Sequence, residues 1–373
     1  MPNAPYSNRW HHKTEMKSLL FAILFIATIT LNGQALGELE GIQIEVNEVD
    51  NAIFTADKFW RGADGAASID LENGKVLWLF SDTFIDPNGT GKRSNSKMIN
   101  NSVAIQEGNS LDKGKISFYH KGNQRKPKSF FELPGETWFW TGHGILANDK
   151  LVIFLFEEKS IEADPGFEAV GWYMAIIDNP FENPLHWKIR YVKGPDTFGV
   201  IVGSSAVLKD KDFIYAYGVK EPSSHEVYLL RLPINKMGEE DVAEVEWWNE
   251  GDWTIRKEML PAPSPLFIGQ TEFSVHFQDD LQQYVQIQTY GFGAASIGYR
   301  LADKLEGPWS QPVIFYQTQL KNKKEFVYSA NAHPEILSDG ILVTYNVNNG
   351  DFKEMINNEH IYFPKFIRVK ISK

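Results

Sequence analysis

The fold is decided by a hairpin that begins as Asp64-Gly65-Ala66-Ala67-Ser68-Ile69, turns at Asn73-Gly74 and returns as Val76-Leu77-Trp78-Leu79-Phe80. β-Branched and aromatic residues fill the returning strand, and Asn-Gly between two such runs is a strong signal for a tight hairpin turn. Glycine and small side chains at the start suit a strand that neighbouring strands crowd. The segment therefore predicts a hairpin whose first strand lies near the centre of a larger β-structure.

The same pattern recurs four more times, with starts about 60 to 80 residues apart. The later copies begin at Gly142, Gly203, Glu272 and His333. Third strands follow the first four hairpins, at residues 102–105, 172–176, 227–230 and 296–300. This spacing suits four-stranded units with long loops. We predict an all-β chain with one domain, a five-bladed β-propeller over residues 38–373. A two-sheet sandwich of similar size is the alternative, but it does not explain five repeats.

Composition excludes several classes of protein. The chain has 373 residues, of which 43% are hydrophobic and 23% charged, as in an ordinary globular protein. It contains no cysteine, which excludes disulfides, thiolate metal sites and a cysteine nucleophile. The net charge of −11 argues against a nucleic-acid partner. We find no phosphate-binding loop, dinucleotide fingerprint, GxSxG nucleophile elbow or sialidase Asp-box repeat.

The N-terminal segment has the pattern of an export signal. Lys17 precedes an apolar run over residues 19–31, which is short for a membrane span, and Ala35 and Gly37 provide the small residues of a cleavage site. We predict a leader and signal peptide over residues 1–37 and an exported protein, periplasmic or secreted, with no membrane span after cleavage. An N-terminal membrane anchor is the alternative. We expect a monomer.

Two aspartates at the open end of the first hairpin are the candidate catalytic pair. Asp64 precedes its first strand and Asp82 follows its second. Pairing Glu72 with Lys75 places Asp82 opposite Gly65, whereas a one-residue bulge places it opposite Asp64 itself. Most glycoside hydrolases use two neighbouring carboxyl groups for catalysis, one of which has a raised pKa. The alternative is that both are ordinary carboxylates at a turn and a strand end.

The other hairpins should deliver further side chains to the same rim. The candidate substrate-binding residues are Arg61, Trp138, Trp140, His143, Glu272, Tyr290, His333 and Glu335. Aromatic faces can hold sugar rings, and charged groups can bind hydroxyls. The histidines at 143, 276 and 333 could converge on a metal, but their spacing favours core histidines, so we predict no metal site. Glu157 and Glu158 are interpreted as a solvated loop. No cofactor is required, and the sequence leaves open whether Ca²⁺ occupies the channel.

Four segments resemble a family of exported bacterial five-bladed propellers, long catalogued as a domain of unknown function, that includes endo-D-arabinanases (glycoside hydrolase family 183). They are WRGADGA (60–66), LWLFSDTF (77–84), GPWS (307–310) and YSANAHPE (328–335). The resemblance covers most of residues 38–373 but is weak between about 180 and 260. It implies that the family's paired aspartates correspond to Asp64 and Asp82, although Ser81 stands where that family has glycine.

The GPWS element is also similar to the wider group of five-bladed arabinanases and fructosidases, glycoside hydrolase family 43 among them. That group carries one acid on each of the first three blades. Here His143 and Ser204 stand at the starts of the second and third repeats, which argues against importing a three-acid site.

The combined prediction is an exported glycoside hydrolase that cleaves a furanoside-rich polysaccharide, with an arabinan favoured by the resemblance. Asp64 and Asp82 would be the acid and the base or nucleophile. The alternative is a non-catalytic propeller that binds a polysaccharide or oligosaccharide. A structural interaction protein with a plugged channel is a third possibility. Production of reducing ends over time separates the hydrolase from the two non-catalytic proteins.

Overall fold

The computed structural model describes residues 43–49, 51–111, 115–163, 166–222, 224–237 and 244–372. The predicted signal peptide, residues 1–37, lies outside this part of the chain. In the described residues the helices are short: α1 (Ala52–Thr55), α2 (Phe352–Asn357) and the 3₁₀ turns η1 (Arg93–Asn95), η2 (Pro184–His186) and η3 (Ile234–Lys236). None of them is long and apolar enough to cross a membrane. The prediction of an all-β chain is confirmed.

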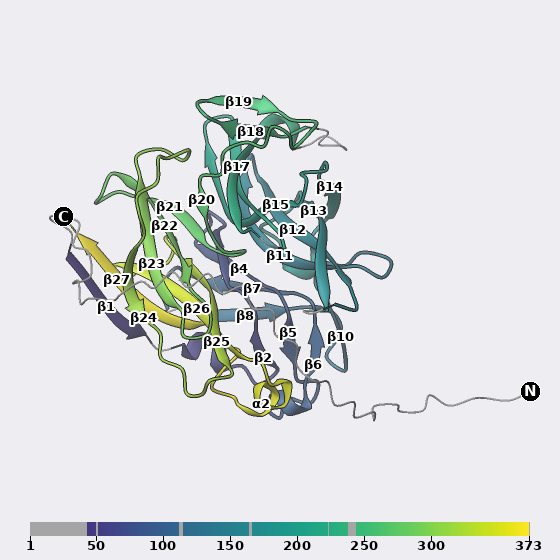
Figure 1. Cartoon of the computed structure of the whole chain (residues 1–373). Helices are drawn as coiled ribbons and strands as arrows, with labels where there is room; N and C mark the ends of the chain where they lie inside the picture. The colour runs from purple at the N-terminus through teal and green to yellow at the C-terminus, as the bar shows by residue number, and fades with distance from the viewer. Residues whose placement is uncertain are drawn as a thin grey trace, which may run out of the picture. The chain divides into compact units, whose positions relative to one another are not determined.

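Strands of the described residues form seven sheets, five of which have four strands or more (Figure 1). The first main sheet contains β3 (Ala67–Asp70), β4 (Lys75–Phe80), β7 (Ser102–Glu107) and β8 (Lys115–Tyr119). The second contains β11 (Trp138–Ala147), β12 (Lys150–Ser160), β13 (Phe167–Ile177) and β14 (Ile189–Lys193). The third contains β15 (Val200–Asp210), β16 (Phe213–Lys220), β17 (Glu226–Pro233), β18 (Glu246–Asn249) and β19 (Asp252–Ile255), with β20 (Phe267–Ile268) paired to β17. The fourth contains β21 (Ser274–Gln278), β22 (Gln283–Tyr290), β23 (Ser296–Ala302) and β24 (Val313–Gln317).

The fifth main sheet joins the two ends of the described chain. It contains β25 (Glu325–Ala332), β26 (Ile341–Asn349), β27 (Lys365–Ser372) and β1 (Gln43–Val49). β1 pairs with β27 in antiparallel register, with Val46 opposite Val369, and the purple and yellow arrows lie side by side in Figure 1. Two small sheets complete the set: β2 (Trp60–Ala63), β5 (Thr83–Ile85) and β6 (Lys97–Ile99), and the hairpin of β9 (Lys121–Asn123) and β10 (Lys126–Lys128).

All five predicted hairpins are present, as the first two strands of the five main sheets. The predicted third strands correspond to β7, β13, β17 and β23. Their apolar runs are continuous because both faces of the sheets are covered. Along β4, for example, Trp78 and Phe80 face the fifth main sheet, whereas Leu77 and Leu79 face the second. The number of blades stays a prediction, since two further small sheets accompany the five main ones.

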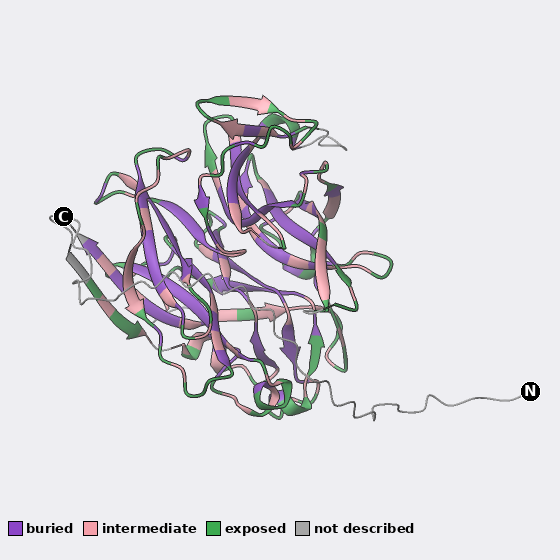
Figure 2. Ribbon diagram, viewed as in Figure 1, coloured by how far each residue is buried: buried purple, intermediate pink, exposed green. Residues whose placement is uncertain are grey.

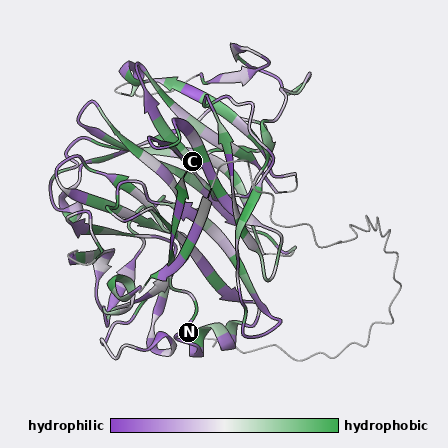
Figure 3. Ribbon diagram, turned by 90° about the vertical axis from the view of Figure 1, so that its left-hand side faces the viewer, coloured by the Kyte–Doolittle hydropathy of each residue, from purple (hydrophilic) through white to green (hydrophobic). Residues whose placement is uncertain are grey.

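The core consists of five clusters of buried hydrophobic side chains, each between two main sheets. Four of them join consecutive sheets, and one joins the fifth sheet to the first through Trp78, Leu342 and Phe366. Buried residues follow the inner strands, and the outer strands β1 and β19 carry exposed ones (Figure 2). Hydrophobic and hydrophilic positions alternate along many strands (Figure 3).

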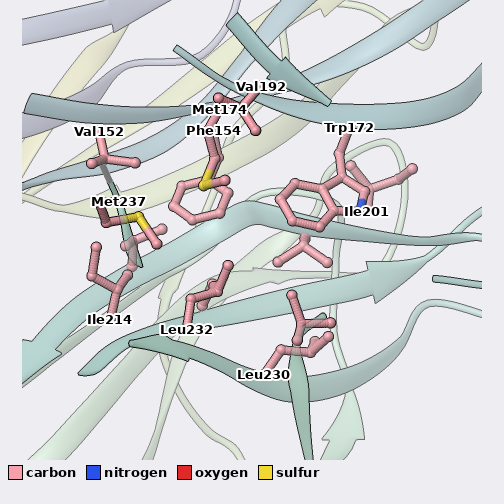
Figure 4. Close-up of a cluster of buried hydrophobic side chains, with 14 of the residues drawn as sticks. Val152, Phe154, Trp172, Met174, Val192, Ile201, Ile214, Leu230, Leu232 and Met237 are labelled. Atoms are coloured by element: carbon pink, nitrogen blue, oxygen red, sulfur yellow. The ribbon is translucent and has the colours of Figure 1, made fainter. Parts of the chain in front are cut away.

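The cluster between the second and third main sheets illustrates how such an interface is filled (Figure 4). Phe154 and Trp172 stack with ring centroids 5.9 Å apart and an interplanar angle of 22°. Ile201 from β15 and Leu230 from β17 pack against them from the third sheet. Side chains from both sheets therefore interdigitate in this interface.

Candidate active site

Asp64 and Asp82 lie directly opposite each other at one end of the first main sheet. The strand segments before and after the two aspartates have the same register, since Ala63 lies opposite Thr83 and Ala67 lies opposite Leu79. The amide N–H of Asp64 donates to the carbonyl oxygen of Asp82 over 3.0 Å, and the carbonyl oxygen of Asp64 accepts from the amide of Ser81 over 2.9 Å, so Ser81 and Asp82 together oppose Asp64. The structure therefore has the pairing that the sequence assigned to a one-residue bulge.

The turn of this hairpin explains the register. Leu71 N–H donates to the carbonyl of Lys75 over 3.1 Å, so three residues, not two, form the loop. Glu72 and Gly74 adopt positive φ angles of 55° and 79°. The extra residue shifts the returning strand by one position, and that shift brings Asp82 opposite Asp64.

Asp64 is held by two tyrosines from the fifth main sheet and the loop that follows α2. The hydroxyl of Tyr328 donates to its Oδ1, and the hydroxyl of Tyr362 donates to its Oδ2 over 2.6 Å. Burial, followed by the charge of Asp82, raises the pKa of Asp64 well above its ordinary value, and the Tyr362 hydrogen bond opposes the shift. The surroundings of Asp64 therefore favour the protonated carboxyl group.

Asp82 has a different environment. Its Oδ1 accepts a hydrogen bond from Nε1 of Trp140 over 2.8 Å. Burial raises the pKa of Asp82 to about 6, and hydrogen bonds from Trp140 and Asn100 limit the increase. Asp82 therefore lies beside a neighbour whose surroundings favour its protonated form. A pair whose pKa values are pushed apart can divide acid and base roles.

Glu272 reaches the same place from the fourth main sheet. A Cβ atom on Gly65 would lie 3.0 Å from its Oε1, so glycine allows this close approach. Burial raises the pKa of Glu272 to about 7, opposed by a hydrogen bond from Ser329. Its charge is also close enough to contribute to the raised pKa of Asp64. Three carboxyl groups thus gather at this end of the sheets.

A small pocket lies beside Gly65 and Glu272. Each of the five main sheets contributes lining residues to it, either from an inner strand or from a position next to one. The lining residues are Gly65, Ala66, Ala67, Leu79, Thr141, Gly142, Ser204, Ser205, Glu272 and Asn331. Small side chains dominate the list, which fits the crowding predicted for the starts of the first strands. The arrangement brings residues that are distant in sequence to one spot beside the aspartate pair.

Glu158 is a neighbour of the pair that the sequence interpretation missed. It was expected in a solvated loop, but β12 continues through it, and its side chain is only 2% exposed. Its Oε2 has no hydrogen-bond partner among the described residues. Burial, followed by the charges of Glu221 and Asp82, raises the pKa of Glu158 to about 8. Glu158 lies on the same face of β12 as the buried Phe154 and Phe156, but Leu155 and Glu157 on the other face are buried as well, so the signal was the continuation of the apolar strand into the two glutamates.

Some predicted substrate-binding residues lie beside the pair, and others do not. Trp140 contacts Asp82, and Trp138 packs edge-to-face on Trp140 with centroids 6.4 Å apart. Arg61 is 8% exposed and is engaged elsewhere, by an ion pair of 3.0 Å to Glu359 and a hydrogen bond to the carbonyl of Asp57. Tyr290 is half-buried beside the guanidinium of Arg300.

His333 lies deeper, in the interior, whereas His143 and Glu335 are half-buried. His333 is fully buried, and its ring nitrogens lie 2.5 Å from Ser68 Oγ and 2.7 Å from Thr344 Oγ1. Burial and the neighbouring charges of His143 and His276 lower the pKa of His333 to about 3. His333 thus links the fifth main sheet to the first. Within the described residues no group of His, Asp and Glu side chains is arranged to hold a metal ion.

These buried titratable groups predict a stability maximum in weakly acidic solution. The carboxyl groups of Asp82, Glu272 and Glu158 have pKa values raised to about 6, 7 and 8, so their stabilising protonated form is lost as the pH rises through those values. The imidazoles of His143 and His333 have pKa values lowered to about 4 and 3, so their stabilising neutral form is lost as the pH falls below about 6.5 towards those values. The carboxyl groups begin to lose this stabilisation above their ordinary pKa of about 4, and three of them outweigh two imidazoles, so we expect the thermal unfolding midpoint to peak at about pH 4 to 5.

Differential scanning fluorimetry from pH 3 to 9 measures this profile. Glu158→Gln provides the matched comparison, because its amide cannot titrate and should reduce the loss of stability between pH 6 and 8. A midpoint that climbs steadily from pH 5 to 9 contradicts the prediction.

The fold and the site together define an all-β protein whose main sheets meet beside a cluster of carboxyl groups. The chain belongs to the family described as a domain of unknown function (DUF5005), whose model matches residues 47–371. No curated protein matches the sequence.

Among solved structures, a Bacteroides ovatus protein provisionally named a hydrolase has a TM-score of 0.71 at 17% identity, over 87% of this chain and 90% of that chain. This similarity shows the fold. A GH43_1 enzyme from Xanthomonas citri complexed with xylose has a TM-score of 0.46 at 15% identity, over 87% and 90% of the two chains. An exo-1,5-alpha-L-arabinanase from a bovine ruminal metagenomic library has a TM-score of 0.44 at 9% identity, over 84% and 94%.

Proposed function

We propose that this protein is a glycoside hydrolase in which Asp64 and Asp82 are the catalytic pair. The observation that carries the proposal is the backbone pairing of Asp64 with Asp82, which brings two carboxyl groups with unlike hydrogen-bond partners to one end of the sheet. Asp64 favours its protonated form and Asp82 has a pKa near 6, which suits a general acid beside a base or nucleophile. Glycosidic bonds are cleaved by such a pair, one carboxyl group protonating the leaving oxygen while the other acts on the opposite side.

The division of labour follows from the hydrogen bonds. Tyr328 and Tyr362 fix both oxygens of Asp64, so its proton would be presented in a defined direction. Trp140 holds Oδ1 of Asp82, and Asn100 also donates a hydrogen bond to this carboxyl group. Glu272 and Glu158 add buried carboxyl groups around the pair, and by repulsion they favour retention of a proton in the site.

We infer that the five main sheets are the blades of a propeller. The inference is supported by the five hydrophobic clusters, which join each sheet to the next and the fifth to the first. In that architecture the inner strands surround a channel, and the aspartate pair lies at its mouth beside the pocket that all five sheets line.

The substrate in this proposal is a furanoside-rich polysaccharide, with an arabinan as the first choice. That choice rests on the resemblance of residues 60–66 and 77–84 to the propeller family that includes endo-D-arabinanases. The proposal also includes an exported, monomeric protein, periplasmic or secreted, whose signal peptide is residues 1–37.

A reducing-sugar and chromatography screen tests the proposal. The protein is incubated with D-arabinan, L-arabinan and fructan, and Asp64→Asn is the control. We expect wild type, and not the variant, to release fragments from at least one polymer. Binding to a polymer without release of fragments would instead favour a non-catalytic glycan-binding propeller.

A further inference from the structure

A row of three aromatic side chains extends outward from Asp64. Phe292 and Phe326 stack with centroids 5.7 Å apart and an interplanar angle of 15°. Phe326 in turn contacts Tyr328, with centroids 5.5 Å apart. Tyr328 donates its hydroxyl hydrogen bond to Asp64. The outer end of the row is open, because Phe292 is 88% exposed, the highest value among the large hydrophobic side chains in the described residues.

The loop that carries Phe292 has a defined conformation. Gly291 and Gly293 flank Phe292 with positive φ angles of 89° and 74°, which glycine adopts without strain. The carbonyl of Gly293 accepts hydrogen bonds from the amides of Ala295, over 2.8 Å, and Val327, over 3.0 Å. The second of these bonds ties the loop to β25, the strand that bears Phe326 and Tyr328. The stacked rings therefore have a fixed place relative to Asp64.

The row lies at the end of the sheets where the aspartates lie. β22 ends at Tyr290, just before the loop, and β25 begins at Glu325, just before Phe326. Tyr328, two residues further along β25, reaches Asp64. Flat rings that are open to water and continuous with a site for sugars suit the apolar C–H faces of sugar rings. Each step in the row is comparable with the length of one sugar unit.

We propose that Phe292 and Phe326 form a binding platform for sugar units of the polysaccharide that lie away from the bond at Asp64. This platform deepens the proposed function and rests on it. A chain seated at the aspartate pair would continue past Tyr328 and cover Phe326 and Phe292, so the protein should bind polymers better than short fragments. The platform supplies affinity and no chemistry, because neither phenyl ring reaches the carboxyl groups.

Phe292→Ala and Phe326→Ala test the platform by two measurements. The first is affinity electrophoresis in gels that contain D-arabinan, L-arabinan or fructan, where each variant should lose retardation. The second is hydrolysis kinetics on the polymer that the wild type cleaves, where KM should rise about 2- to 10-fold while kcat changes little. Phe292→Trp should retain or strengthen the retardation, since it keeps a flat ring.

Phe181→Ala is the matched control. Phe181 is also exposed, at 48%, and lies just after the C-terminal end of β13. That end of β13 pairs with Leu151, at the opposite end of β12 from Glu158 and the candidate site. Its removal should change neither retardation nor KM. Thermal midpoints check that all variants fold.

The possible outcomes separate the platform from the proposed function. Retardation that Phe292→Ala abolishes, without hydrolysis of any polymer, supports the platform and contradicts the hydrolase. Hydrolysis with the same KM and the same retardation in wild type and both alanine variants overturns the platform and leaves the hydrolase. A wild-type protein that none of the three polymers retards overturns the platform as well.

Discussion

Replacement of Asp64 or of Asp82 by asparagine is expected to lower kcat on the cleaved polysaccharide by about 10²–10⁴-fold. Asparagine occupies nearly the same volume. In Asp64→Asn its oxygen accepts from one tyrosine and its NH2 group can donate to the hydroxyl oxygen of the other, and in Asp82→Asn its oxygen accepts from Trp140, but it can neither donate the acid proton nor act as a base. The loss should appear in kcat and in kcat/KM together, because proton transfer occurs only in the transition state. Initial rates of reducing-end formation measure both constants.

Two further readouts distinguish a catalytic role from a structural one. The pH profile of kcat/KM should have an acid limb near pH 6, set by ionisation of Asp82. Asp64→Asn should not lower the thermal midpoint, since the amide imitates the uncharged carboxyl group that the site favours. Asp70→Asn is the matched control, because Asp70 is exposed at the turn end of the same hairpin, where its side chain accepts a hydrogen bond from the amide of Glu72. Full activity in both Asp64→Asn and Asp82→Asn would refute the assignment.

The strands were predictable because their apolar patterns are local. Each hairpin contains its own turn signal and its own run of β-branched and aromatic residues, such as residues 76–80 before Ser81. The aspartate pair was predictable for the same reason, since both residues belong to one hairpin. The sequence left open only whether Asp82 lies opposite Gly65 or opposite Asp64. The structure shows a three-residue turn, in which Glu72 has a positive φ angle, and this turn places Asp82 opposite Asp64.

Contacts between distant segments were not predictable from one sequence. No local pattern indicates that β1 pairs with β27, or that Tyr362 reaches Asp64 across 298 positions. Glu158 shows a different difficulty. Two adjacent glutamates indicate a solvated loop by composition, whereas the structure continues the buried strand of residues 151–156 through both of them. Buried polar residues near a candidate site break the ordinary pattern, so rules based on composition misplace them.

Arg93→Lys is expected to destabilise the protein by about 3 kcal/mol or more and to lower activity as well. Arg93 is fully buried. Its guanidinium donates to the carbonyl oxygens of Arg61, Met355, Asn358 and Ile361, over 2.6 to 3.0 Å. A lysine ammonium is a compact group that cannot span four acceptors in this fork, so buried carbonyls would lose their partners.

The effect should extend to Asp64 because Arg93 fixes the loop that carries Tyr362. Three of its four acceptors belong to α2 and the residues up to Ile361, and the guanidinium packs over the rings of Tyr362 and Phe363 at 5.5 and 5.3 Å. Once this loop is loosened, Tyr362 should no longer hold Asp64 Oδ2, and kcat should fall even at temperatures where the variant is fully folded.

Urea unfolding and steady-state kinetics on one preparation test both parts of this prediction. Arg125→Lys is the matched control, because Arg125 is exposed and the exchange should cost less than about 0.5 kcal/mol. A stable Arg93→Lys variant would show that the carbonyl oxygens find other partners. A destabilised variant with normal kcat would show that Arg93 supports the fold without positioning Tyr362. A fall in both the free energy of unfolding and kcat would show that Arg93 stabilises the fold and also positions Tyr362 against Asp64.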